Sequence, residues 1–186
     1  MCERELGDRF ACGGEVELGE VVDVYGEKLL RYATGILGDY QDAEDVVQAV
    51  FLIAYQKRGT FDGRHLSAWL YKITYRHCLN QLKKRKPIFL ADMGNVREET
   101  VDPFVDLAVS DGILEALGQL AAKERALLLC RIMDGRSYEE LSHIFGGSPA
   151  ALRKQYERAK KKLMAYLNAE GILGKEFHDA DEQESF

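Results

Sequence analysis

The side chains best suited to chemistry in this sequence stand in a basic stretch near its C-terminal end. On a helix, Lys154 and Arg158 can donate hydrogen bonds to guanine edges, and Glu157 can accept one from the amino group of cytosine. Small side chains at Ala150 and Ala151 would let the helix approach a major groove closely. Neighbouring cations suit phosphates, which position a protein without specifying a sequence: Arg153, Lys160, Lys161 and Lys162. We expect a duplex DNA interface formed by Ala150, Arg153, Lys154, Glu157, Arg158 and Lys161.

The elements that must position these side chains follow a helix-turn-helix pattern. Ser137 and Glu140 form a capping box that opens a short helix expected over 138–145. Two glycines then turn the chain, and Ser148 caps a last helix that runs to about residue 168. A solvated amphipathic helix with no role in binding would also carry cations on its outer face. The caps and the glycine turn favour the DNA-binding interpretation, because several local signals agree with it.

The distribution of charge along the chain also indicates a polyanionic partner. The 186 residues include 25 Lys and Arg against 31 Asp and Glu, which gives a formal net charge of −6. Two blocks run against this acidic balance: residues 51–90 hold nine basic residues and one acidic residue, and residues 123–167 hold ten and five. A single basic block is often only a solvated helix face. Two such blocks in one short chain favour a nucleic-acid partner.

Composition excludes several other classes of protein. A hydrophobic share of 46% and a charged share of 30% are typical of a globular chain with one or two domains. No apolar run reaches about eighteen residues and no basic-then-apolar signal opens the sequence, so neither a membrane span nor secretion is expected. The four cysteines form no C-x-x-C pair, which argues against zinc and disulfide frameworks. We therefore expect a cytoplasmic protein without a metal or another cofactor.

Apolar residues that recur at every third or fourth position predict helices along most of the chain. The predicted ranges are 16–37, 43–57, 67–86, 113–120 and 123–133, followed by the helix-turn-helix. We expect an all-α protein with two small helical domains joined by a flexible linker, the second domain containing the helix-turn-helix. The expected boundaries are a flexible N-terminus at 1–15, a first domain at 16–87, an acidic linker at 88–111, a second domain at 112–170 and an acidic tail at 171–186.

Three stretches resemble sigma factors of the extracytoplasmic-function (ECF) group, within the bacterial sigma-70 family. Residues 42–52 (DAEDVVQAVFL) are similar to that group's DAEDLVQEVFL signature, and residues 66–73 (LSAWLYKI) to its FRAWLYRI. Residues 135–163, from GRSYEEL to RAKKKL, are similar to its helix-turn-helix pattern. The resemblance implies a protein that binds core RNA polymerase, directs it to promoters and helps to open the DNA, without being an enzyme itself.

The resemblance also implies a polymerase contact in the first domain. The helix expected over 43–57 matches the family's contact with the clamp helices of the largest polymerase subunit. Carried over by position, the contact residues are Asp45, Gln48, Ala49 and Leu52. These residues share one helix face, and an acidic, partly apolar strip suits a basic protein partner better than DNA. The last helix correspondingly matches the family's reader of the minus-thirty-five promoter element.

The loop at 58–65 and the helix after it match the family's segment for the minus-ten promoter element. Opening DNA unstacks bases at a cost of roughly a few kcal/mol each, which a surface with cations and aromatic rings can offset by binding the separated strand. The residues of these types are Arg58, Phe61, Arg64, His65, Lys72, Tyr75, Arg76, Asn80, Lys83 and Lys84. Trp69 stands at a core position, where packing is the expected role. The triplet at 74–76 and Glu157 depart from the family pattern, so the family's promoter sequences are not carried over.

Other functions fit these residues less well. A helix-turn-helix regulator that does not bind polymerase would leave the first domain unexplained. An enzyme is not favoured, because the four histidines are scattered and neighbouring His77 and Cys78 point about 100° apart on a helix. A helical interaction protein without a DNA role is a third alternative, which a DNA-binding assay at low salt separates. Family members are commonly held inactive by an anti-sigma protein, so the resemblance implies such a partner.

Overall fold

The computed structural model describes residues 3–84 and 111–170, and every regular element in these two ranges is a helix. The first domain consists of α1 (Glu3–Cys12), α2 (Glu15–Leu37), α3 (Tyr40–Lys57), the 3-10 turn η1 (Arg58–Thr60) and α4 (Leu66–Lys84). The second consists of α5 (Asp111–Gly118), α6 (Ala122–Ile132), α7 (Tyr138–Phe145) and α8 (Pro149–Ala169). The prediction of an all-α protein with two helical domains is confirmed. Across the described ranges, no helix combines the length and apolar character needed to cross a bilayer.

A helix occupies the N-terminal segment that the sequence predicts to be flexible. Helix α1 buries Leu6 and Phe10, which stand four residues apart and therefore lie on one helix face. The ring of Phe10 lies 6.4 Å from the ring of Trp69 in α4, measured between centroids. The prediction of flexibility at 1–15 is thus wrong over α1, because packing on the first domain orders this helix.

The other helices of the first domain start and end close to the predicted residues. The Asp39 side chain accepts a hydrogen bond from the backbone N–H of Asp42 at 2.8 Å, and this cap starts α3 at Tyr40. Helices α2, α3 and α4 pack on one another around a buried core. Within it the rings of Tyr32 and Tyr71 lie 4.9 Å apart. This packing leaves the outer faces of α3 and α4 exposed.

The second domain is built around α6. Residues 126–130 of this helix are all buried, because α2 covers one side of α6 and α8 covers another. Helix α8 also contacts α5 and α7. The predicted helices of this domain are present with shifts of one or two residues at their ends. The predicted acidic linker, except for its last residue, and the predicted acidic tail lie outside the described residues.

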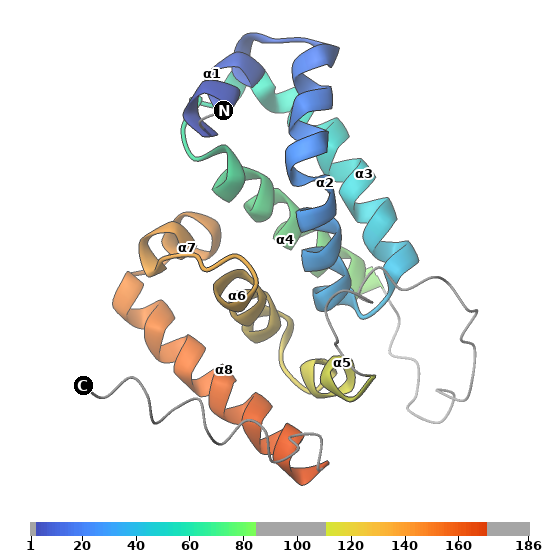
Figure 1. Ribbon diagram of the computed structural model, residues 1–186, viewed down its shortest axis with the longest axis vertical. Coiled ribbons are helices and arrows are strands. Elements are labelled where there is room, and N and C mark those ends of the chain that lie inside the picture. Colours follow the sequence, from blue (N-terminus) through green and yellow to red (C-terminus); the bar gives the residue numbers. More distant parts are fainter. Residues whose placement is uncertain (1–2, 85–110, 171–186) are drawn as a thin grey trace.

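The two domains pack against each other in the structure. Helix α2 lies against α6, and α4 lies against α7 (Figure 1). At the first of these contacts, Gly35 of α2 makes room for Leu129 of α6, since a Cβ atom at residue 35 would lie 2.6 Å from Leu129 Cδ1. Part of the surface of α4 that lies next to α7 is predicted to bind DNA.

The buried thiols of Cys78 and Cys130 predict a loss of stability at alkaline pH. Burial raises the pKa of each thiol to about 12, whereas cysteine in an unfolded chain ionises near pH ~8.5. The folded protein holds these protons more tightly, so their contribution to stability is complete below about pH 8.5 and is lost as the pH rises toward about 12. We expect the free energy of urea unfolding to fall more steeply between about pH 8 and 11 in the native chain than in a Cys78→Ala/Cys130→Ala variant. Parallel curves would contradict this prediction.

Candidate nucleic-acid interface

The helix-turn-helix of the second domain has the local geometry that its sequence predicts. The Ser137 hydroxyl accepts a hydrogen bond from the backbone N–H of Glu140 at 3.2 Å, and the Glu140 carboxylate accepts one from the backbone N–H of Ser137 at 2.8 Å. The second bond lowers the pKa of Glu140. Gly146 and Gly147 follow in the left-handed region, which glycine adopts without a steric penalty. The hydroxyl of Ser148 then caps α8.

Helix α8 has a buried apolar face and an exposed cationic face. Its buried residues are Leu152, Ala159, Leu163 and Leu167. All six residues predicted to read duplex DNA are exposed: Ala150, Arg153, Lys154, Glu157, Arg158 and Lys161. In the described ranges, none of the four cations in this set takes part in an ion pair. Because α8 runs along the outside of the second domain (Figure 1), this face is open to a duplex.

One of the lysines predicted to contact phosphate also forms an ion pair within the second domain. Lys162 Nζ lies 2.6 Å from Glu124 Oε1 at the start of α6. The same hydrogen bond lowers the pKa of Glu124, whose other oxygen accepts the backbone N–H of Ala121 at 3.1 Å. Lys162 therefore ties α8 to the N-terminal end of α6.

The ten residues predicted for the minus-ten element lie in three different environments. Six are exposed along the loop and α4: Arg64, His65, Arg76, Asn80, Lys83 and Lys84. Three are half-buried: Arg58, Lys72 and Tyr75. Phe61 is buried, with 8% of its surface exposed. The exposed residues extend from the loop to the C-terminal end of α4.

Phe61 and Arg58 make contacts that stabilise the conformation of the loop at 58–65. The Phe61 ring stacks on Trp69 with 4.8 Å between centroids and 25° between planes. Arg58 donates from Nε to the Gly13 carbonyl at 2.8 Å and from Nη1 to the Tyr55 carbonyl at 2.6 Å. Trp69 is a packing residue, as its core position predicts. Phe61, predicted as part of the minus-ten surface, belongs to the same aromatic cluster, because the loop folds back on α1 and α4.

Helix α7 covers part of the surface predicted to bind the minus-ten element. The rings of His65 and His143 stack 4.7 Å apart, and those of Tyr75 and Phe145 meet edge-on at 5.1 Å. His65 and Tyr75 both belong to the predicted DNA-binding set. In this arrangement of the domains, α4 therefore does not present its whole surface to DNA.

Arg136, which the sequence places only in a turn, fastens the two domains together. Its side chain is buried, with 8% exposed, and donates a hydrogen bond to the Ser67 hydroxyl of α4. The guanidinium carbon lies 4.1 Å from the centre of the Tyr71 ring, and Nε lies 3.7 Å from the Asp134 carboxylate. No local pattern marks this residue, because two of its three partners come from the other domain.

Helix α3 presents a separate face of different character. Asp45 and Gln48 are exposed, Ala49 is half-buried and Leu52 is 61% exposed. These are the four residues that the resemblance assigns to polymerase binding. A cavity of about 600 Å³ lies between α3 and α4 and is lined by Asp45 and Ala49 on the α3 side. The face combines a carboxylate with exposed apolar surface, which suits a basic protein partner.

Comparison with known proteins places both domains in one family. The model of sigma-70 region 2 matches residues 21–88, and the model of sigma-70 region 4 matches residues 110–163. The ECF RNA polymerase sigma factor SigW of Bacillus subtilis (strain 168) is 25% identical over 170 residues. The aligned part covers 83% of this chain and 91% of that protein.

Two solved structures are similar to this one over most of their length. CnrH, solved in complex with the cytosolic domain of CnrY, is 26% identical with a TM-score of 0.71, and the match covers 90% of this chain and 97% of that chain. The sigma factor RpoE, solved with the anti-sigma factor NepR from Bartonella quintana, is 24% identical with a TM-score of 0.66 and covers 81% and 96%. The second likeness concerns the fold alone. With both of its domains matched, the chain belongs to the sigma-70 family, as a member of the ECF group.

Proposed function

We propose that this chain binds core RNA polymerase through α3, reads the minus-thirty-five element with α8 and opens the minus-ten element with the loop at 58–65 and α4. The observation that best supports this is the presence of two exposed cationic surfaces on separate domains, beside a third face of different chemistry. A promoter offers two separated elements to such a pair of surfaces. A regulator that only binds DNA would need the α8 surface but not the α3 face.

The side chains on each surface indicate which part of the promoter it binds. On α8, Lys154 and Arg158 donate to base edges, while Arg153 and Lys161 contact phosphates. On α4, the cations from Arg76 to Lys84 attract the separated strand. The polymerase carries out the chemistry of RNA synthesis, so the chain acts as a binding subunit and not as an enzyme. It works in the cytoplasm, where polymerase and DNA are.

We infer in addition that an anti-sigma protein holds the chain inactive. Two structural relatives were solved with partners: CnrH with the cytosolic domain of CnrY, and RpoE with the anti-sigma factor NepR. In the present arrangement α7 already contacts His65, which stays exposed, and the half-buried Tyr75. A partner that stabilises this arrangement would hinder the access of the minus-ten element to these two residues without touching α8.

Transcription in vitro tests the proposed function directly. Purified chain and core polymerase should initiate at defined sites on genomic DNA, and these sites can be mapped by sequencing the RNA ends. Leu52→Asp places a charge at the centre of the α3 face, and we expect it to abolish co-purification with polymerase while leaving the helical circular dichroism unchanged. A chain that binds promoter DNA tightly by itself and never co-purifies with polymerase would be a plain regulator, and the proposal would fail.

Arg158→Ala measures the contribution of the recognition helix. Loss of one good base contact is worth about 1–3 kcal/mol, so we expect promoter affinity of the complete holoenzyme to fall by roughly five- to 150-fold. The measurement is a filter-binding titration with duplex promoter at fixed salt. Lys123→Ala, which removes an exposed cation of α6, is the matched control and should bind like the native chain. Equal affinities for all three proteins would exclude α8 as the reader.

A further inference from the structure

Helix α1 lies before residue 21, where the match to sigma-70 region 2 begins, yet it contacts both η1 and α4. The first of these elements opens the loop at 58–65, and the second follows it directly. We propose that α1 is a working part of the promoter-opening surface: it holds this loop in shape, and its Arg4 adds a contact to the phosphates of the separated strand. This inference rests on the proposed role of the loop and α4 at the minus-ten element.

The backbone of α1 meets the backbone of the loop directly. A Cβ atom on Gly7 would lie 2.5 Å from the carbonyl oxygen of Gly63, so no side chain fits between them. Gly63 has a φ of 76°, and a Cβ atom there would lie 2.2 Å from Asp8 Oδ1. The close approach therefore depends on a glycine in α1 and on a glycine in the loop. A shift of α1 must move the loop.

A second contact joins α1 to the start of α4. Glu3 Oε1 accepts a hydrogen bond from the backbone N–H of Ser67 at 2.9 Å and so satisfies a free amide in the first turn of α4. His65, directly before α4, has a φ of 52°, which costs energy for any residue except glycine. A strained backbone persists only where its surroundings fix it. By binding the Ser67 amide, Glu3 helps to hold the backbone at His65 in this conformation.

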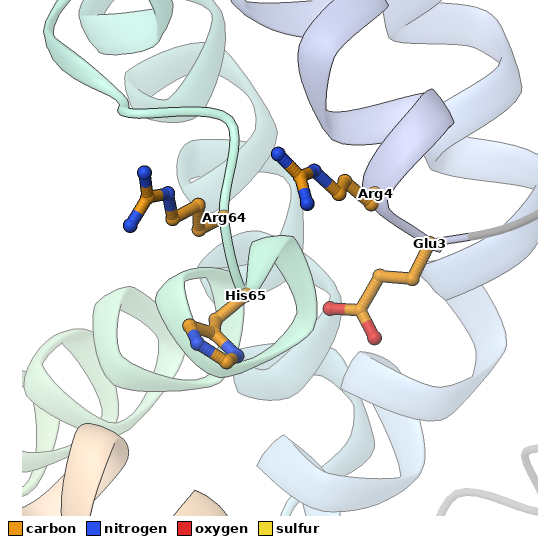
Figure 2. Close-up of a pocket in the computed structure, with 4 residues that line it drawn as sticks. All are labelled: Glu3, Arg4, Arg64 and His65. Carbon is orange, nitrogen blue, oxygen red and sulfur yellow. The ribbon is translucent and has the colours of Figure 1, made fainter.

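The third observation is a cavity of about 310 Å³ lined by Glu3, Arg4, Arg64 and His65 (Figure 2). Glu3 and Arg4 come from α1, and Arg64 and His65 come from the loop. The Glu3 carboxylate is engaged by the Ser67 amide. Within residues 3–84 and 111–170, the ion-pair partner of Arg4 is Asp8, at 4.0 Å, and both side chains are more than half exposed, so this pair is weak. Arg4 and Arg64 can therefore both turn to a phosphate at the mouth of the cavity.

Gly7→Ala and Gly19→Ala form a matched pair of variants for the positioning role. Both glycines lie inside helices, where alanine normally favours the helix, but only Gly7 faces the loop, since nothing lies within 4 Å of a Cβ at Gly19. Opening is followed with core polymerase and a duplex promoter that carries a fluorescent base analogue in the minus-ten element. We expect Gly7→Ala to reduce the population of open complexes by about five- to 150-fold, the factor that corresponds to losing the stacking of one base. Gly19→Ala should open the promoter like the native chain.

A promoter with a pre-opened, mismatched minus-ten region separates positioning from a general loss of folding. The deficit of Gly7→Ala should shrink on this template, because the bases are already unstacked. A deficit of equal size on both templates, or none on the duplex, would overturn the positioning role. Glu3→Ala should show the same defect as Gly7→Ala, and Glu3→Gln should restore opening because its amide oxygen still accepts the Ser67 N–H.

Arg4→Ala tests the phosphate contact without disturbing the packing of α1. We expect the slope of log affinity for the separated strand against log salt concentration to become shallower by about 0.7, the value for one phosphate on single-stranded DNA. Lys123→Ala should leave that slope unchanged. An unchanged slope in Arg4→Ala would overturn the contact. If the native chain itself opened no promoter with core polymerase, the proposed function would fail instead, so the two failures are distinct.

Discussion

Trp69→Ala is expected to lower the free energy of unfolding by about 3–5 kcal/mol, the usual cost of truncating a tryptophan, because its half-buried ring packs against the core. The Trp69 ring contacts Phe61 of the loop and Phe10 of α1. Its loss would therefore free the loop from α4 and α1 together. Urea unfolding followed by circular dichroism measures the change. Tyr166→Ala removes an aromatic ring that is 40% exposed on α8 and serves as the control, with an expected loss below about 1 kcal/mol. A similar small loss in Trp69→Ala would contradict the assignment of Trp69 to the core.

Arg136→Ala is expected to destabilise the packed arrangement of the two domains by about 3–5 kcal/mol, since it removes one partner of a buried charged contact. The Ser67 hydroxyl would lose its donor, and the Tyr71 ring would lose the guanidinium at 4.1 Å. We therefore expect the two domains to separate in a large fraction of the molecules. The same substitution should leave the exposed face of α8 intact, because Arg136 makes no contact with it.

Energy transfer between two dyes measures this separation. The dyes are attached at Gln56→Cys on α3 and Glu170→Cys at the end of α8, in a chain whose Cys2 and Cys12 are replaced by serine. Arg136→Ala should shift the distribution of distances to longer values. Arg153→Ala, which removes an exposed arginine from the same domain, should not. An unchanged distribution in Arg136→Ala would mean that the apolar contact of α2 with α6 is sufficient to hold the domains.

Local signals predicted the second domain almost completely. The capping box at Ser137 and Glu140 and the cap at Ser148 are visible in the sequence because each involves residues only three apart. The exposed face of α8 was predictable for the same reason, since helical periodicity alone decides which side chains point away from the core. Where a contact lies within one or two turns of a helix, the sequence was sufficient.

Contacts between distant parts of the chain were not predictable in this way. Helix α1 offers only two large apolar residues, Leu6 and Phe10, and it packs on α2, η1 and α4, the last about sixty residues away. The sequence predicts that Phe61 is an aromatic residue in a loop. That Phe61 is buried becomes clear only from the position of Trp69, on which its ring stacks. The sequence places Arg136 in a turn, whereas in the structure its side chain donates a hydrogen bond to Ser67 of the first domain. In each case the deciding partner is brought near by tertiary packing.

If the loop at 58–65 and α4 bind the minus-ten element as proposed, the contact of α7 with them would also set how much transcription occurs in the absence of a signal. The faces of His65 and Tyr75 that meet His143 and Phe145 would not stack on a melted strand at the same time. The fraction of molecules ready for a promoter is then lowered tenfold for every ~1.4 kcal/mol that favours the closed form. Substitutions on α7 that weaken this contact would raise background expression of the target genes while leaving the choice of promoters unchanged.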